Sequence, residues 1–306
     1  MSYDPWPVSL VEALELPRVR RRSLAVLAAL RPRQWTKNAL VFAGIVFAAQ
    51  IGDPRRWGEA VVAFVAYCAA ASAAYLVNDL RDAEHDRRHP TKRFRPIARG
   101  ELSERAALTM ALLLVVHAVV LTSLLGVWSL ALLVAFLALQ VSYSAGLKHV
   151  VLVDVVIIAA LHALRAAAGA VAVRVHISPW LLACTALLAL FLALAKRRAE
   201  LGLVDATATP GRPVLDGYSR TVLERMLAGL AVATVLVYAA YTLTAGNSRL
   251  MAVTVPFVAF GIARYWLLVR RRGVGEEPEE ILLRDIPLLT AIVLWTIACA
   301  AILVLA

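Results

Sequence analysis

The chain has 306 residues, of which 61% are hydrophobic, and it carries a formal net charge of +11 at pH 7. Because soluble domains average about 45–50% apolar residues, this composition excludes an ordinary soluble globular protein and indicates an integral membrane protein. The three cysteines, Cys68, Cys184 and Cys299, lie within apolar stretches, which favours small buried side chains over a disulfide or metal framework. Residues 1–16 lack the pattern of a secretory signal, so we expect no cleaved signal peptide.

The apolar residues fall into blocks, most of them about 17–22 residues long, the length that crosses a hydrocarbon core of about 30 Å. In chain order, these blocks predict nine membrane-spanning helices, at residues 37–51, 59–77, 106–125, 127–144, 151–173, 179–195, 222–244, 249–268 and 286–306. The turn between the third and fourth, at Gly126, is short enough to predict a helical hairpin. We therefore expect an all-α integral membrane fold, with a basic cytoplasmic segment at residues 1–30 and a single nine-helix domain at residues 31–306.

Lysine and arginine are distributed unevenly between the two faces of the predicted bundle. Of the 32 such residues, 27 lie in the N-terminal segment and at the loops after spans two, four, six and eight, whereas four lie on the opposite face. Because basic loops stay in the cytoplasm, this imbalance predicts a cytoplasmic N-terminus and an external C-terminus in the cell membrane. Topology thus accounts for the positive charge, so nucleic acid is not an expected partner, whereas anionic membrane lipids are.

An acidic run follows the second predicted span and continues its helix. On a period of about 3.6 residues, Asn78, Asp82 and Asp86 lie on one face, with Asp79 beside them. Like charges this close repel one another unless a cation neutralises them, and carboxylate and carboxamide oxygens suit Mg²⁺. The run predicts a magnesium site at the membrane surface, with Asp79, Asp82 and Asp86 as catalytic residues and metal ligands and Asn78 as a substrate-binding residue.

A basic loop comes directly after the acidic run. We expect its Lys92 and Arg95 to bind phosphate oxygens, because basic and metal-binding segments side by side match the needs of a Mg²⁺–diphosphate substrate. The alternative is an ordinary solvated loop, in which Arg81, Arg87 and Arg88 pair with the acidic residues.

A second polar group lies between predicted spans four and five. Tyr143 and Lys148 flank the loop, and Asp154 lies just inside the next span, where an ionised carboxylate is costly unless it faces a polar cavity. We expect Lys148 and Asp154 to be catalytic and Tyr143 to bind substrate, although Lys148 could instead only set topology. Arg165, on the same helical face three turns beyond Asp154, either holds the bundle together or lines a polar vestibule.

Two further polar pairs are predicted on the same face of the membrane. Lys37 and Asn38 open the first predicted span, and Lys196 and Arg197 close the sixth. We expect all four to bind substrate. The alternative is that the basic residues only contribute to the cytoplasmic excess of positive charge.

These residues together resemble the UbiA superfamily of intramembrane prenyltransferases. The acidic run matches its first aspartate motif as Asn78-Asp79-x-x-Asp82-x-x-x-Asp86, and the basic loop resembles the segment that follows it, as Arg95-Pro96-Ile97-Ala98-x-Gly100. The resemblance covers the chain from about residue 30 to its end, and it implies a nine-helix bundle with cytoplasmic loops that cap the active site.

The second aspartate motif departs from the superfamily pattern. Most members have two aspartates four residues apart there, whereas Asp154 is followed four residues later by Ile158. The chain is instead similar to one branch, the actinobacterial decaprenyl-phosphate phosphoribosyltransferases. That similarity lies in Arg31-Pro32-x-Gln34-Trp35-x-Lys37-Asn38, Tyr143-Ser144-x-x-Leu147-Lys148, the stretch from Asp154 to Arg165, Lys196-Arg197-x-x-Glu200, Pro278-Glu279-Glu280 and Arg284-Asp285-x-Pro287.

The resemblance to this branch implies a Mg²⁺-dependent transfer of 5-phosphoribosyl from phosphoribosyl pyrophosphate to a polyprenyl phosphate, with release of pyrophosphate, for arabinan precursors of the cell wall. One alternative is a transferase that moves a prenyl group from its diphosphate to an aromatic or glycerol-phosphate acceptor. A transporter with a vestibule at Arg165 and Asp154 is a third, but no inverted repeat favours it. The chain length of the lipid stays open, as does the oligomeric state, for which a homo-oligomer is one prediction.

Overall fold

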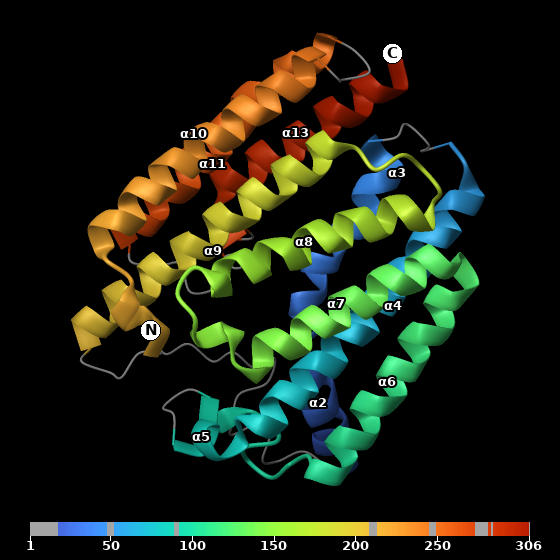
Figure 1. The fold of residues 1–306 in the computed structure, drawn as a ribbon, viewed down its shortest axis with the longest axis vertical. Helices are drawn as coiled ribbons and strands as arrows, with labels where there is room; N and C mark the ends of the chain where they lie inside the picture. The colour runs from blue at the N-terminus through green and yellow to red at the C-terminus, as the bar shows by residue number, and fades with distance from the viewer. Residues whose placement is uncertain are drawn as a thin grey trace. The chain divides into compact units, whose positions relative to one another are not determined.

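The computed structural model describes residues 18–47, 52–88, 92–207, 213–244, 249–272, 281–282 and 284–305. Its elements are α2 (Arg18–Leu30), η1 (Pro32–Phe42), α3 (Ala43–Phe47), α4 (Pro54–Arg81), α5 (Ala83–Arg88), η2 (Lys92–Phe94), α6 (Glu104–Leu125), α7 (Val127–Ala145), η3 (Leu147–His149), α8 (Val153–Ala172), α9 (Pro179–Thr207), η4 (Pro213–Gly217), α10 (Arg220–Thr244), η5 (Arg249–Thr254), α11 (Val255–Arg272) and α13 (Ile286–Leu305). All these regular elements are helical, so the predicted all-α class is confirmed for the described residues (Figure 1). The motif Pro278-Glu279-Glu280 lies outside them.

Seven helical stretches within the described ranges are long and apolar enough to cross a membrane, and they match the second to eighth predicted spans. At the ninth, α13 has a shorter apolar stretch, Ile286–Ile302. The first predicted span, residues 37–51, is not one continuous α-helix, because the 3-10 helix η1 occupies its start and α3 ends at Phe47. Residues 48–51 lie outside the described ranges. The structure therefore supports a multi-pass membrane protein, but it does not confirm the count of nine spans.

The chain divides into two compact units, residues 1–39 with 61–137 and residues 40–60 with 138–306. The predicted division at residue 30 stays a prediction. In the first unit, α2, α4 and α6 share a core of small and aliphatic side chains, including Ala29, Leu76 and Ala107. Gly126 separates α6 from α7 with a φ of +118°, a conformation that glycine adopts readily, and it thereby permits the short turn of the predicted hairpin.

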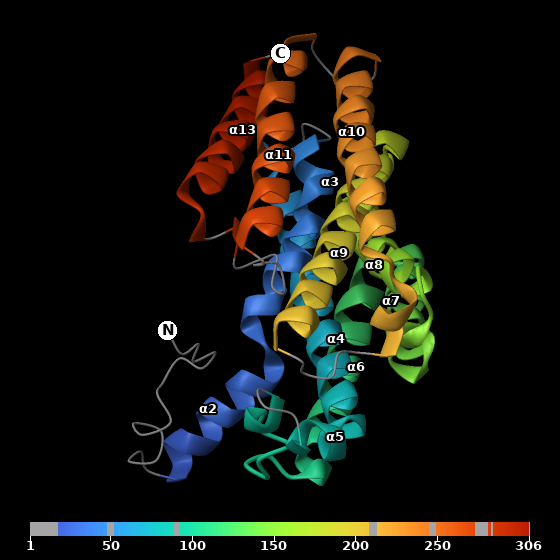
Figure 2. The same cartoon turned by 90° about the vertical axis from the view of Figure 1, so that its left-hand side faces the viewer.

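In the second unit, α8, α9 and α10 pack in sequence (Figure 1), and α11 packs against α13 (Figure 2). Their core includes Phe191, Leu194 and Leu223. The segment before α4 crosses α8 with backbones in contact, since a Cβ built on Gly169 would lie 1.8 Å from the carbonyl oxygen of Val41. Residues of the first predicted span, in η1 and α3, therefore pack against α8.

Candidate functional site

The acidic run at the end of α4 is helical, as its spacing predicts. The amide of Asp82 donates to the carbonyl of Asn78 at 2.9 Å, and the amide of Asp86 donates to that of Asp82 at 2.8 Å, so helical hydrogen bonds connect α4 to α5. Within this turn, the side-chain amide of Asn78 donates to Asp82 Oδ2 at 3.1 Å. The structure thus places Asn78 beside one carboxylate of the run and holds Asp82 half-buried at the helix surface.

Asp79 and Asp86 form a buried acidic pair that shares one guanidinium nitrogen. Arg95 Nη1 lies 3.0 Å from Asp79 Oδ1 and 2.6 Å from Asp86 Oδ2. The two acidic residues are only 3% and 1% exposed. Burial raises the pKa of Asp86 above its ordinary value, and the neighbouring Arg95 offsets only part of this increase. The structure therefore brings together three predicted site residues from α4, α5 and the basic loop.

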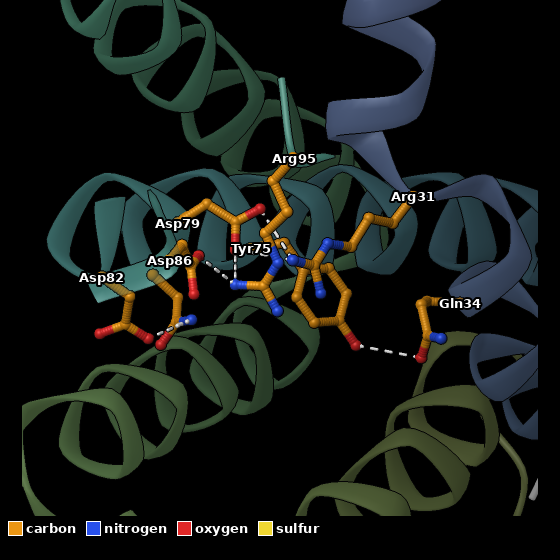
Figure 3. Close-up of polar contacts among 8 residues, drawn as sticks. Arg31, Gln34, Tyr75, Asp79, Asp82, Asp86 and Arg95 are labelled. Carbon is orange, nitrogen blue, oxygen red and sulfur yellow. Dashed lines mark hydrogen bonds and ion pairs between the residues drawn. The ribbon is translucent and has the colours of Figure 1, made fainter. Parts of the chain in front are cut away.

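Arg31 joins the same group, although the sequence analysis did not select it. Its Nη2 donates to both carboxylate oxygens of Asp79, at 2.6 and 2.7 Å (Figure 3). Its guanidinium also lies 4.8 Å from the ring centre of Tyr75, within the range of a cation–π contact. Arg31 has a φ of +54°, which a non-glycine residue rarely adopts. The only sequence signal was its position at the head of the Arg31-Pro32-x-Gln34-Trp35-x-Lys37-Asn38 motif.

The rest of that motif lies beside Arg31. Gln34 Oε1 accepts a hydrogen bond from Lys37 Nζ at 2.7 Å. It also accepts a longer one from the hydroxyl of Tyr75, at 3.4 Å (Figure 3). Asn38 is fully buried, and its side-chain amide donates to Cys68 Sγ at 3.3 Å. Lys37 therefore lies near Arg31, because Lys37 contacts Gln34 and Arg31 contacts Tyr75, which are themselves hydrogen-bonded. The amide of Asn38 instead lies buried against Cys68 of α4.

Lys92 begins η2, three residues before Arg95, and is half-buried. Its charge acts on the carboxyl of Asp86. Within the described ranges, no three His, Cys, Asp or Glu side chains are grouped closely enough to hold a metal ion. Arg31 forms an ion pair with Asp79, and Arg95 forms ion pairs with both Asp79 and Asp86. The roles of Asp79, Asp82 and Asp86 as metal ligands stay predictions.

A second polar group lies within the other compact unit and contains Asp154, Arg197, Glu200 and Tyr218; we call it the Asp154 network. Asp154 Oδ2 accepts a hydrogen bond from Arg197 Nε at 2.7 Å, and Asp154 Oδ1 accepts one from the hydroxyl of Tyr218 at 2.6 Å. Arg197 also pairs with Glu200 one turn later on α9. Asp154 is 0% exposed and Arg197 1%. The structure thus joins two predicted site residues to each other and adds Tyr218, which the sequence analysis did not select.

The remaining predicted residues of this region belong to the same compact unit as the network. Tyr143 near the end of α7 interacts electrostatically with Arg197, Lys148 lies half-buried in η3, and Lys196 lies next to Arg197 on α9. Arg165 is buried within α8, and its Nη1 donates to the carbonyl of Leu161 at 2.9 Å. Both alternatives for Arg165, holding the bundle together or lining a polar vestibule, stay predictions.

Known proteins match most of the length of the chain. Residues 39–279 match the model of the UbiA prenyltransferase family. Decaprenyl-phosphate phosphoribosyltransferases from Mycobacterium tuberculosis and Corynebacterium glutamicum are 40% and 38% identical to this chain over 85% of its length, covering 88% and 81% of theirs.

Solved structures share the fold at lower identity. A UbiA homologue from Archaeoglobus fulgidus bound to GPP and Mg²⁺ superposes with a TM-score of 0.71 at 19% identity, covering 91% of this chain and 99% of its own. A digeranylgeranylglyceryl phosphate synthase superposes with a TM-score of 0.64 at 17% identity, covering 92% and 98%. Because the family model matches most of the chain and the relatives match along nearly all of it, the chain belongs to the UbiA prenyltransferase family.

Proposed function

We propose that this protein transfers a 5-phosphoribosyl group from phosphoribosyl pyrophosphate to a polyprenyl phosphate, such as decaprenyl phosphate, and releases pyrophosphate. The observation that carries the proposal is the 38–40% identity, over 85% of the chain, to enzymes named decaprenyl-phosphate phosphoribosyltransferase. It is supported by the arginines gathered around the acidic pair, because a donor with a diphosphate and a 5-phosphate needs several cations.

The donor set of the acidic run fits a magnesium ion. Asp79, Asp82 and Asp86 supply carboxylate oxygens and Asn78 supplies a carboxamide, and Mg²⁺ prefers such oxygen ligands together with substrate phosphates. These residues would hold the ion. When bound, the ion would neutralise the charge that develops on the leaving pyrophosphate. The fold neighbour from Archaeoglobus fulgidus, bound to GPP and Mg²⁺, supports a divalent ion in this family.

Arg31 and Arg95 would bind the phosphates of the donor. Both arginine side chains are about one-quarter exposed, although the carboxylates that they contact are buried. An arginine fork matches the geometry of phosphate oxygens and can bind two of them at once. Lys37 follows Arg31 by six residues and Lys92 precedes Arg95 by three, and both lysines would add charge for the 5-phosphate of the donor.

The reaction itself needs little proton transfer. An oxygen of the lipid phosphate attacks C1 of the ribose, the new C–O bond forms, and the bond from C1 to the pyrophosphate oxygen breaks with its electron pair leaving on pyrophosphate. Because a phosphate is already an anion at neutral pH, no strong general base is needed. Catalysis by this chain would therefore rest on orienting the two substrates and on fixed positive charge at the leaving group.

The excess of basic residues on one predicted face supports a site at the cytoplasmic surface of the cell membrane, where a soluble donor is available. Anionic lipids as further partners and a homo-oligomeric assembly stay predictions.

The direct test uses the purified protein in lipid nanodiscs with Mg²⁺, phosphoribosyl pyrophosphate labelled in the ribose, and decaprenyl phosphate. We expect a labelled lipid product and one equivalent of pyrophosphate. The same assay with Asp82→Asn serves as the control for the metal site, and absence of a lipid-linked product with the wild-type protein would refute the proposal.

A second candidate is transfer of a prenyl group from its diphosphate, which the GPP-bound fold neighbour favours. Labelled geranyl diphosphate, offered with aromatic or glycerol-phosphate acceptors, separates the two reactions, because the label then moves to the acceptor rather than from the sugar donor to the lipid.

A further inference from the structure

η1 is an eleven-residue 3-10 helix, whereas 3-10 segments usually extend for only about three or four residues. Because such a helix has about three residues per turn, side chains three positions apart lie in one row along it. Exposure along the start of η1 follows this period, since Arg33 and Thr36 are exposed. Gln34 and Lys37, in the neighbouring row, are half-buried. The amide of Gln34 donates to the carbonyl of Arg31 at 2.9 Å, and we call Arg31, Gln34 and Lys37 the Gln34 row.

A third row fixes η1 to α4 within the same compact unit. Trp35 Nε1 donates to Ser72 Oγ at 3.0 Å. One turn further along η1, Asn38 Nδ2 donates at 3.3 Å to Cys68 Sγ, one turn earlier on α4. Three residues of a 3-10 helix and four of an α-helix both rise about 6 Å, so the two helices match turn by turn. Ser72 Oγ also donates to the carbonyl of Leu30 at 2.8 Å, which fixes the residue directly before the Gln34 row.

Gln34 uses the oxygen of its carboxamide and leaves the nitrogen for a ligand. Its Oε1 accepts from Lys37 Nζ at 2.7 Å. Because an ammonium group can only donate, this contact determines which end of the carboxamide is the oxygen. The hydroxyl of Tyr75 donates to the same oxygen at 3.4 Å (Figure 3). None of the described residues accepts a hydrogen bond from Gln34 Nε2.

Arg31 is also held by α4 with part of its guanidinium unused. Its Nη2 donates to both oxygens of Asp79, and the ring centre of Tyr75 lies 4.8 Å from its central carbon. In the part of the chain that the structure describes, Nε and Nη1 of Arg31 have no acceptor. Its φ of +54° is strained for a non-glycine residue and persists only where the surroundings fix it. Ser72, through Leu30, and Tyr75 supply these contacts.

A phosphate group is the ligand chemistry that the Gln34 row fits. The row offers guanidinium, carboxamide and ammonium N–H groups, which all donate hydrogen bonds, and two of these groups are cations. In an α-helix, side chains three positions apart would diverge by about 60°, so the 3-10 geometry of η1 aligns Gln34 with Lys37. We propose that Gln34 is a substrate-binding residue, that the Gln34 row binds phosphate oxygens of the donor, and that Ser72 and Tyr75 are positioning residues for the row. Only the identity of the donor rests on the proposed function.

The first test measures binding of inorganic pyrophosphate with Mg²⁺, by calorimetry on the protein in lipid nanodiscs. Gln34→Met keeps the length of the side chain but removes its N–H donors, so we expect roughly five- to tenfold weaker binding, the loss typical of one hydrogen bond. Gln34→Glu keeps an acceptor for Lys37 and should bind at least as weakly. The matched control is Thr36→Val, on the exposed row of the same helix. Unchanged affinity in Gln34→Met, an equal loss in Thr36→Val, or no binding by the wild-type protein would overturn the proposal.

The second test separates positioning by Tyr75 from general stability. We expect Tyr75→Leu to weaken pyrophosphate binding roughly fivefold, and Tyr75→Phe, which keeps the ring against Arg31, to recover most of that loss. In an Arg31→Gln background, Tyr75→Leu should have a much smaller effect, because the group that the ring positions is gone. Tyr67→Leu is the control, since Tyr67 is buried on the same helix against Phe136, and it should lower the melting temperature without weakening binding. Additive effects of Tyr75→Leu and Arg31→Gln would refute the role of Tyr75.

The third test follows Ser72 through the indole of Trp35, by nuclear magnetic resonance of protein with ¹⁵N-labelled tryptophan. Ser72→Ala removes the acceptor of the indole N–H, so we expect the Trp35 resonance to move and the pyrophosphate affinity to fall together. Ser129→Ala, at a buried serine of α7, is the control and should change neither. A moved resonance with wild-type affinity would remove Ser72 from the positioning role. Since none of the three tests uses the sugar donor or the lipid, intact binding results without lipid-linked product would refute only the proposed function.

Discussion

Arg31 and Asp79 are 48 positions apart in the chain, yet one guanidinium nitrogen of Arg31 donates to both carboxylate oxygens of Asp79. The contact ties the segment between α2 and η1 to the end of α4, beside the acidic run. It also means that Asp79 is neutralised from two directions, by Arg31 and by Arg95.

Arg31→Gln should lower kcat/KM for the phosphoribosyl donor by about ten- to 100-fold, because a hydrogen bond to a charged group contributes about 1.5–3 kcal/mol. Arg31→Lys should recover part of that loss, since it keeps the charge but not the planar fork. Steady-state kinetics with varied donor give both values. An Arg31→Gln variant with wild-type kinetics would remove Arg31 from the site.

Arg95→Gln should have opposite effects on two ligands. Arg95 contacts Asp79 and Asp86, two of the proposed metal ligands, so its removal should strengthen binding of Mn²⁺ alone, roughly tenfold. The same change should weaken binding of pyrophosphate, because a phosphate-binding cation is lost. Calorimetry measures both. Arg93→Gln is the control, since Arg93 is exposed and stacks on Phe94, and weaker binding of both ligands to Arg95→Gln would contradict the prediction.

Metal affinity should depend on pH through Asp86. Burial raises the pKa of this carboxyl, so its protonated form persists to a higher pH than in an exposed aspartate, and protons compete with the metal there. We expect Mn²⁺ affinity to fall as the pH is lowered, beginning well above 3.8, the ordinary value. Asp86→Asn should bind Mn²⁺ more weakly and lose this step. A pH profile that is identical in the two proteins would exclude Asp86 as its source.

Gly169→Ala should destabilise the fold by roughly 1–3 kcal/mol or more, because the new methyl group would meet the carbonyl oxygen of Val41 at 1.8 Å. Thermal unfolding in detergent should show a clearly lower midpoint. Gly229→Ala is the matched control, since a Cβ at Gly229 in α10 meets nothing within 4 Å and alanine favours a helix. Equal midpoints in the two variants would argue against the close crossing with α8.

Local spacing in the sequence predicted the arrangement of the acidic run, because four residues within one helix follow a single period. The same reasoning could not reveal Arg31, whose contact with Asp79 depends on tertiary packing and on an unusual backbone angle. It also treated Asp154 and Arg197 as separate site residues, whereas they form one ion pair across 43 positions. The charges of Asp154 and Arg197 are evident from the sequence. That they pair with each other depends on how the chain folds, which their positions in the sequence do not reveal.

The first predicted span illustrates a second limit. An apolar stretch that starts at residue 37 suggests a membrane helix, but composition alone cannot distinguish it from a segment that packs against a neighbouring helix. Gly44 and Gly169 allow that packing, but nothing in the sequence distinguishes them from other glycines in apolar stretches. Asn38 is buried and its carboxamide donates to Cys68, while its role in substrate binding stays a prediction.

The arginines around Asp79 and Asp86 also bear on how the protein is made. Two buried carboxylates that depended on a metal ion for neutrality would leave a newly inserted chain unstable until the ion arrived. Because Arg31 and Arg95 are encoded in the same chain, this corner of the bundle can assemble during insertion, whatever the magnesium supply. A chelator such as EDTA should therefore stop turnover and leave the melting temperature of the protein almost unchanged.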